Sequence, residues 1–232
     1  MIRLAVFALP LLLLLPGAAS AADRTVSVGS FERVRIDGPF SVRLVKGSPG
    51  ARISGDPRAA EAVEIRVDGT TLSVRRSIGT WGEQNGSGVQ KPVTVTLSTP
   101  RIAYASVIAG GRLTIDRMTG LRVDLAVSGA GTIAVEAVQA DQVNATVIGT
   151  GRMTLAGRAA RARLTVSGAG LMEATALLVD DLTVVQDGAG ETRAAARRTA
   201  QVTNGGAGSV TVEGTAACTV RAAASGPVVC GD

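Results

Sequence analysis

Histidine is absent from this 232-residue sequence, and aromatic residues make up only 2% of it. Histidine is the usual general base near neutral pH and the most common metal ligand. A catalytic site with a general base, or a metal site, would therefore have to use other residues. After residue 21 the aromatic side chains are Phe31, Phe40, Trp81 and Tyr104. Any hydrophobic core must therefore be built from Val, Leu, Ile and Ala, and a sugar-binding cleft would lack its usual aromatic platform.

Lysine is scarce as well, with Lys46 and Lys91 the only two. The net charge of +5 comes from arginines that are spread along the chain. A nucleic-acid-binding surface needs basic residues gathered on one face, with aromatic side chains when it binds single strands. Scattered charge more often solvates a surface. We therefore predict that nucleic acid is not a partner.

Long apolar runs are confined to the N-terminus. Arg3 precedes an apolar stretch at 4–15, and the small residues 19–21 form an A-x-A cleavage pattern. This predicts a signal peptide over residues 1–21, cleaved after Ala21, with an uncleaved anchor as the alternative. No cysteine comes directly after the leader, which excludes an acylated lipoprotein start, and no later apolar run is long enough to span a bilayer. The mature protein is expected in the periplasm or secreted to the cell surface.

The only cysteines are Cys218 and Cys230, twelve residues apart near the C-terminus. In an exported chain an isolated pair most simply forms a disulfide, which in a loop of this size stabilises by about 3 kcal/mol. Two unpaired thiols are the alternative, and no C-x-x-C redox motif occurs. The pair flanks the turn expected at 225–227. We predict that the bridge closes this turn and blunts the open strand edge at the end of the fold.

Glycine, by contrast, is abundant, and a Gly-x-Gly turn recurs through the second half of the chain. Its copies lie at 129–131, 149–151, 168–170, 188–190 and 206–208, with a degenerate copy at 109–111. The second glycines are separated by 20, 20, 19, 20 and 18 residues. A fixed period in this range indicates stacked structural repeats, each of which needs a neighbour to bury its apolar face.

Apolar and polar residues alternate on both sides of each turn, which is the periodicity of strands. The apolar series before and after the turns includes Val123, Leu125, Val127, Val143, Ala145, Val147, Ile133, Val135, Met153 and Leu155. A repeat too short for a helix predicts a parallel β-solenoid with rungs of about 20 residues, spaced by about 4.8 Å. A tight corner needs positive φ and leaves no room for a Cβ, so Gly131 and Gly170 are expected to be structural.

The repeat weakens around Gly190. The segment 194–198 is alanine-rich, and the pattern at 185–188 looks displaced by an inserted residue. We expect a locally distorted rung at this place, with a short helix as the alternative.

Residues 31–76 have a less regular β-rich pattern. Strand signals are centred on 31–36, 40–44, Ile53, 63–67, 72–74 and, after a loop at 77–92 around Trp81, 93–97. Asp56 followed by Pro57 fits an N-cap and a first helical position, which predicts one helical turn. We expect residues 22–232 to form a single β-solenoid domain with its core at about 30–213 and a C-terminal cap at 214–232.

Several of these segments carry a resemblance to a known family. They are Phe31-x-x-Val34-x-Ile36-x-Gly38, Phe40-x-Val42-x-Leu44-x-x-Gly47, Gly55-Asp56, Asp68-Gly69-Thr70-x-Leu72-x-Val74 and the Ser-Gly-Ala-Gly turns at Ser128 and Ser167. Together they resemble the head GIN domain family of autotransporter adhesins from bacterial envelopes, over residues 30 to 213. The resemblance implies a β-solenoid fold and export, and it carries over no catalytic residue.

The glycine turns do not form a known ligand motif. A dinucleotide site needs G-x-G-x-x-G between a strand and a helix, whereas more strand follows these turns, and no P-loop pattern occurs. Calcium-binding β-rolls place an aspartate in each repeat, and near these turns only Asp187 is available. We therefore predict neither a cofactor nor a metal.

Asp116 and Glu136 are the candidates for a catalytic pair. Each follows the second glycine of its turn by five residues, so stacked rungs place them about 5 Å apart, the spacing of retaining glycosidases. Like charges also stack on ordinary solvated strands, where Arg112 and Arg117 can offset them.

We predict a non-catalytic envelope or surface protein that presents a solenoid face to a protein or polysaccharide partner. A structural periplasmic spacer is the alternative, and a carbohydrate-active enzyme using Asp116 and Glu136 is the second alternative.

Overall fold

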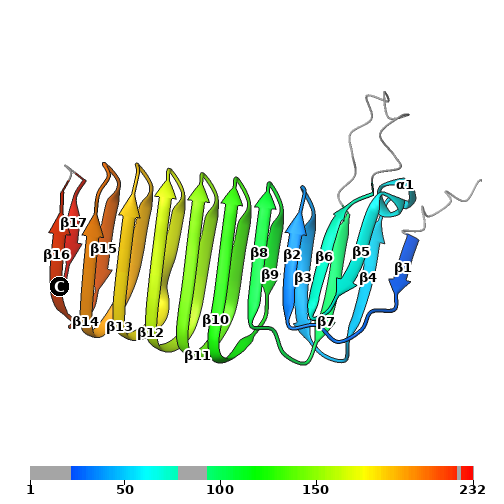
Figure 1. The fold of residues 1–232 in the computed structure, drawn as a ribbon, viewed down its shortest axis with the longest axis horizontal. Helices are drawn as coiled ribbons and strands as arrows, with labels where there is room; N and C mark the ends of the chain where they lie inside the picture. The colour runs from blue at the N-terminus through cyan, green and yellow to red at the C-terminus, as the bar shows by residue number, and fades with distance from the viewer. Residues whose placement is uncertain (1–21, 78–92, 224–225, 232) are drawn as a thin grey trace, which may run out of the picture.

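The computed structural model describes residues 22–77, 93–223 and 226–231, which form a 17-stranded sheet coiled around an apolar interior (Figure 1). The predicted all-β class is confirmed, with a β-solenoid preceded by a less regular block. The leader predicted at 1–21 and nearly all of the loop around Trp81 lie outside the described residues.

The less regular block contains β1 (Ala22–Val26), β2 (Arg33–Asp37), β3 (Ser41–Lys46), β4 (Gly50–Gly55), α1 (Pro57–Glu61), β5 (Val63–Asp68), β6 (Thr71–Arg76) and β7 (Thr94–Thr99). The solenoid contains β8 (Tyr104–Ala109), β9 (Arg112–Ile115), β10 (Met118–Gly129), β11 (Thr132–Gly149), β12 (Arg152–Gly168), β13 (Leu171–Asp187), β14 (Glu191–Asn204), β15 (Ser209–Glu213), β16 (Ala217–Ala222) and β17 (Val228–Cys230).

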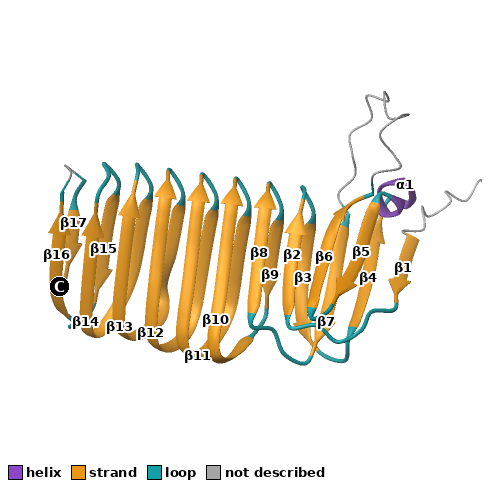
Figure 2. Cartoon of the chain, viewed as in Figure 1, coloured by secondary structure: helices purple, strands orange, loops and turns teal. Residues whose placement is uncertain are grey.

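Each regular rung is a flattened loop with two straight sides (Figure 2). A long strand such as β11 runs along one side, bends, returns along the other side and ends at a Gly-x-Gly turn. We call the edge with these turns the turn edge, and the opposite edge, where β10 to β14 bend, the bend edge. Side 1 contains β8, β16 and the C-terminal parts of β10 to β14. Side 2 contains β9, β15, β17 and the N-terminal parts of β11 to β14.

Parallel register places the apolar residues of successive rungs directly over one another. On side 1, Val127 pairs with Val147 and Val147 with Val166. On side 2, Ile133 pairs with Met153. All five side chains are buried, and burying a side chain of this size contributes about 1.5–3 kcal/mol. The alternation seen in the sequence is thus the inward face of two stacks of strands.

In the turns at 129–131, 149–151, 168–170 and 188–190, the two glycines are required for different reasons. The first, as at Gly129 and Gly149, has a φ of +95° and +106°, which side chains with a Cβ rarely adopt. The second does not. A Cβ on Gly131 would instead lie 2.5 Å from Val107 Cγ1 on the preceding rung. Assigning positive φ to Gly131 and Gly170 was therefore wrong, because these glycines are needed for the close approach of rungs.

The rung around Gly190 is distorted, as predicted, but at a different place. Residues 194–198 are strand, so the helix alternative was wrong. Gln186 pairs in register with Val166, so no inserted residue displaces the turn. The register of β13 with β14 shifts instead at the bend edge, within 174–181, because β14 has 14 residues and β13 has 17.

Two buried polar side chains interrupt the apolar stacks in this rung. Gln186 lies over Val166, and Thr192 lies over Met172. Thr192 Oγ1 donates a hydrogen bond to Gln186 Oε1 at 2.7 Å, whereas Gln186 Nε2 has no partner among the described residues. A buried donor without a partner costs about 1–3 kcal/mol, so this pair is a weak point in the core.

We expect Thr192→Val alone to lower the free energy of unfolding by about 1–3 kcal/mol, because it leaves the whole Gln186 amide without a hydrogen bond. The double variant Gln186→Met with Thr192→Val should be more stable than this single variant, because both polar partners are replaced by apolar groups of similar size. Urea unfolding measures both. A double variant less stable than the single one would contradict this account of the pair.

The less regular block continues both sides of the solenoid. On side 1, β2 pairs in parallel with β8 and β6, and on side 2, β3 pairs in parallel with β9 and β7. Further out, β5 pairs antiparallel with β6, and β4 pairs antiparallel with β7. β1 in turn pairs antiparallel with β4. The predicted helical turn is α1, which begins at Pro57, and Asp56 Oδ1 accepts a hydrogen bond from the Ala59 N–H at 3.3 Å.

At the other end, Cys218 and Cys230 form the predicted disulfide. Cys218 pairs with Ala200 and Cys230 with Val212, and both of these partners point into the core. The bridge therefore lies on the inner side of the last rung and joins its two sides. All six residues of β16 are exposed, since among the described residues no further rung covers them.

Candidate functional site

The bend edge carries an open groove with a volume of about 530 Å³, which crosses the rungs from β10 to β14. Its floor is a row of small residues aligned by the parallel register. Gly120 pairs with Ala140, and Ala140 pairs with Ala159. Because these residues have a single side-chain carbon or none, a trough forms between the longer side chains on either side of them.

The two walls of the groove offer mostly polar groups. The wall toward side 2 consists of Thr119, Gln139, Arg158 and Leu178, aligned by the same register. The wall toward side 1 includes Asp141, Ala160, Asp180 and Arg197. Since rungs repeat every 4.8 Å or so, a hydroxyl, an amide and a guanidinium group follow one another at that spacing along the wall toward side 2, and the carboxylates lie on the opposite wall.

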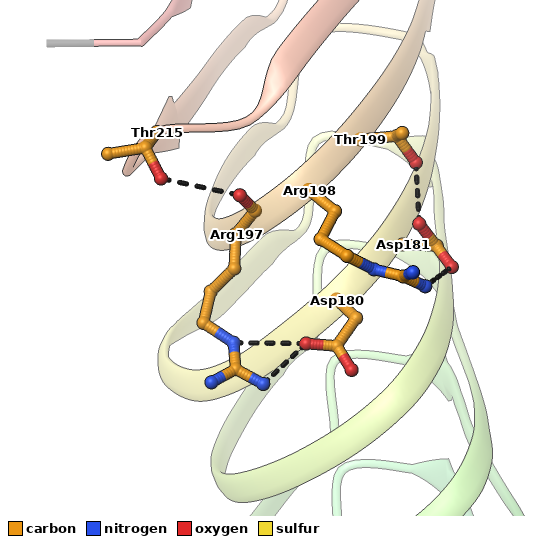
Figure 3. Close-up of polar contacts among 6 residues, drawn as sticks. All are labelled: Asp180, Asp181, Arg197, Arg198, Thr199 and Thr215. Atoms are coloured by element: carbon orange, nitrogen blue, oxygen red, sulfur yellow. Dashed lines mark hydrogen bonds and ion pairs between the residues drawn. The ribbon is translucent and has the colours of Figure 1, made fainter.

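Two ion pairs between neighbouring rungs lie at the end of the groove nearest the C-terminus (Figure 3). Arg197 Nε donates to Asp180 Oδ1 at 3.0 Å, and Arg198 Nη2 donates to Asp181 Oδ2 at 2.6 Å. Asp181 also accepts a hydrogen bond from Thr199 at 2.8 Å. Both carboxylates are therefore already occupied by arginines of the next rung.

A smaller depression continues the groove toward the N-terminal block. It shares Thr119 with the groove and is lined by three cations, Lys46, Arg101 and Arg117. Arg101 forms an ion pair with Glu32. Lys46 and Arg117 have no ion-pair partner in the part of the chain that the structure describes.

The charges along these two depressions are unequally compensated. Like Lys46 and Arg117, Arg158 has no ion-pair partner among the described residues. Asp141 is the one lining carboxylate in the same situation, because Asp180 is paired with Arg197. Along the two depressions, three cations without an ion-pair partner therefore outnumber one such carboxylate.

The residues predicted as a catalytic pair lie outside the groove. Asp116 follows β9 and pairs with Arg43, with 3.1 Å between Arg43 Nη2 and Asp116 Oδ1, and Glu136 is an exposed residue of β11. Ile115 pairs with Val135, so the two carboxylates follow a paired position on neighbouring rungs. Arg43, on β3, was not foreseen, and it offsets the charge of Asp116.

Sequence reasoning missed the groove itself. Its floor residues Gly120 and Ala140 both follow the second glycine of their turns by nine residues, and Ala159 follows by eight. A row of small residues opposite the turn edge was therefore visible in the sequence.

Among the described residues, no three His, Cys, Asp or Glu side chains gather closely enough to hold a metal ion. No helix in the described part of the chain is both long and apolar enough to span a bilayer.

Several solved structures share this fold. A putative adhesin from Bacteroides fragilis NCTC 9343 superposes with a TM-score of 0.80 at 16% identity, covering 93% of this chain and 98% of that chain. A putative adhesin from Parabacteroides distasonis ATCC 8503 gives a TM-score of 0.67 at 18% identity, covering 93% and 98%. A putative lipid binding protein from the same strain gives 0.69 at 15% identity, covering 90% and 96%. At these identities the likeness shows the fold alone.

The curated proteins contain no match to the chain. Residues 30–216 match the family described as "Putative auto-transporter adhesin, head GIN domain". This family and the disulfide together indicate a location outside the cytoplasm. Since the match covers most of the sequence, the chain belongs to the head GIN domain family of putative auto-transporter adhesins.

Proposed function

We propose that this protein is an exported, non-catalytic binding module, adhesin-like in role, and that the bend groove receives part of a protein or polymer partner. The observation that carries the proposal is the groove, in which small floor residues and polar wall residues are aligned across successive rungs. Binding sites are usually concave, with a few well-placed polar groups, and this groove has both properties.

The scaffold supports this role because its floor is held in place. Successive strands of β10 to β14 are hydrogen-bonded in parallel on both sides of the solenoid. A groove built on such strands exists before the partner arrives, so binding loses little conformational entropy. The repeat in the groove also favours an extended partner over a compact one.

The proposed site of action is the periplasm or the cell surface, after cleavage of the leader following Ala21. The mature chain, residues 22–232, should bind saturably to envelopes isolated from the source bacterium, and sedimentation of the protein with increasing amounts of envelope measures this. Absence of saturable binding would contradict the proposal and favour a spacer.

We expect the mature chain to release no product from labelled envelope or plant polysaccharides. If any release is seen, it should be unchanged in the double variant Asp116→Asn with Glu136→Gln, because the Asp116 carboxylate already pairs with Arg43. Size-exclusion chromatography of the labelled polymer measures cleavage. Cleavage that the double variant abolishes would establish an enzyme and overturn the proposal.

A further inference from the structure

The charge of the bend edge narrows the class of partner. Arg197 and Arg198 are neutralised by Asp180 and Asp181, so this end of the groove carries paired charges. Among the other residues that line the two depressions, the cations without an ion-pair partner are Lys46, Arg117 and Arg158, and the carboxylate without one is Asp141. The complementary partner carries negative charge.

The positions of these cations suit an extended polymer. Arg117 lies at the bend between β9 and β10, and Arg158 lies in β12, two rungs further along the solenoid. Two rung steps of about 4.8 Å separate their backbones by roughly 10 Å along the solenoid axis. A chain that runs along the groove can therefore present one anionic group to each arginine.

The remaining wall groups indicate a partner rich in hydroxyl groups. Gln139 lies on the wall between Thr119 and Arg158, and Asp141 lies across the floor from it. The Gln139 amide both donates and accepts hydrogen bonds, and the Asp141 carboxylate accepts them. A purely anionic ligand would be repelled by Asp141, whereas a polymer with both hydroxyl and anionic groups satisfies Asp141 and the arginines together.

We propose that the bend groove and the smaller depression that continues it bind an acidic polysaccharide, with Arg158 of the groove and Arg117 of the depression pairing with its anionic groups and Gln139 and Asp141 bonding to its hydroxyls. This inference rests on the proposed function, because it names the partner of the same groove. Arginine suits the role, since its planar fork pairs with carboxylate or sulfate through two hydrogen bonds.

The test measures dissociation constants of the mature chain for polygalacturonate, dextran sulfate and neutral dextran by biolayer interferometry. The wild type should bind one or both acidic polymers at least about tenfold more tightly than dextran, and this binding should weaken as salt is raised. The double variant Arg117→Gln with Arg158→Gln should weaken binding of the acidic polymer about tenfold or more.

A matched control is the double variant Arg112→Gln with Arg152→Gln. Both residues are exposed, lie on side 2 in β9 and β12, and have no ion-pair partner among the described residues. It removes the same charge outside the groove, so its binding should stay within about twofold of wild type. Equal losses in both double variants would overturn the inference, since they would show general charge attraction only.

Two further outcomes separate the inference from the proposed function. If the wild type binds dextran as tightly as the acidic polymers, the partner is not an acidic polysaccharide, but the protein is still a binding module. The same conclusion follows if it binds none of the polymers but still binds envelopes, and protease treatment of the envelopes abolishes that binding. Absence of binding both to envelopes and to polymers would overturn the proposed function as well.

Discussion

Replacing Gly131 or Gly170 with valine will lower the free energy of unfolding by at least about 3 kcal/mol. A Cβ on Gly131 would lie 2.5 Å from Val107 Cγ1 and 3.1 Å from Gly111 O, and one on Gly170 would lie 2.5 Å from Val147 Cγ1 and 2.9 Å from Gly151 O. The carbonyl oxygens belong to the neighbouring turns, which are hydrogen-bonded from rung to rung. Relief of the clash therefore requires the stack to separate.

Gly110, also on the turn edge, provides a control for the two valine substitutions. Gly110 is the middle residue of the first turn, where a Cβ would meet nothing within 4 Å, and the equivalent position of the next turn is Ala130. We expect Gly110→Ala to leave stability within about 0.5 kcal/mol of wild type. Chemical unfolding compares the variants. Wild-type stability in both valine variants would remove the argument for closely stacked turns.

Removing the disulfide with Cys218→Ser and Cys230→Ser should lower the free energy of unfolding by about 2–3 kcal/mol. The bridge closes the last rung across its inner side, and among the described residues β16 and β17 otherwise pair only with β14 and β15 of the rung before them. Without it the two sides of this rung can separate. Exposed strand edges and the apolar Val220, 44% exposed, should then favour association of one molecule with another.

Two measurements check this prediction. Mass spectrometry of periplasmically expressed protein, alkylated without reduction, should find neither cysteine modified, and two modified cysteines would contradict a capping role. Sedimentation of the double serine variant should show association that the wild type lacks. A variant that stays monomeric and as stable as wild type would show that the bridge is dispensable.

The solenoid could be predicted because its signals repeat in every rung. Val127 and Val147 occupy the same place before successive turns, and the parallel register then stacks them. The reason for each glycine could not be predicted in the same way. The sequence gives no sign that Gly129 and Gly131 differ in role. Only the path of the backbone shows that Gly129 is needed for its positive φ and Gly131 for the close approach of a neighbouring rung.

The groove was harder to foresee because it depends on the path of the bend. Alternation with a period of two describes the straight sides, but the register shifts at the bends, as between Val135 and Val138 of β11. Such shifts decide which residues align across rungs. The sequence therefore showed Gly120 and Ala140 as small residues, while only the structure shows that they form the floor of a trough between Gln139 and Asp141.

The central claim is that the bend groove is the binding surface, and filling the groove tests it most directly. Ala160 is an exposed residue of the groove, and Ser128 is an exposed residue of β10 on side 1, away from it. The measurement is the binding isotherm of Ala160→Trp and Ser128→Trp on isolated envelopes, after confirming that both melt like wild type. We predict at least about tenfold weaker binding for Ala160→Trp and wild-type binding for Ser128→Trp. Wild-type binding by Ala160→Trp, or loss of binding in Ser128→Trp alone, would contradict the claim.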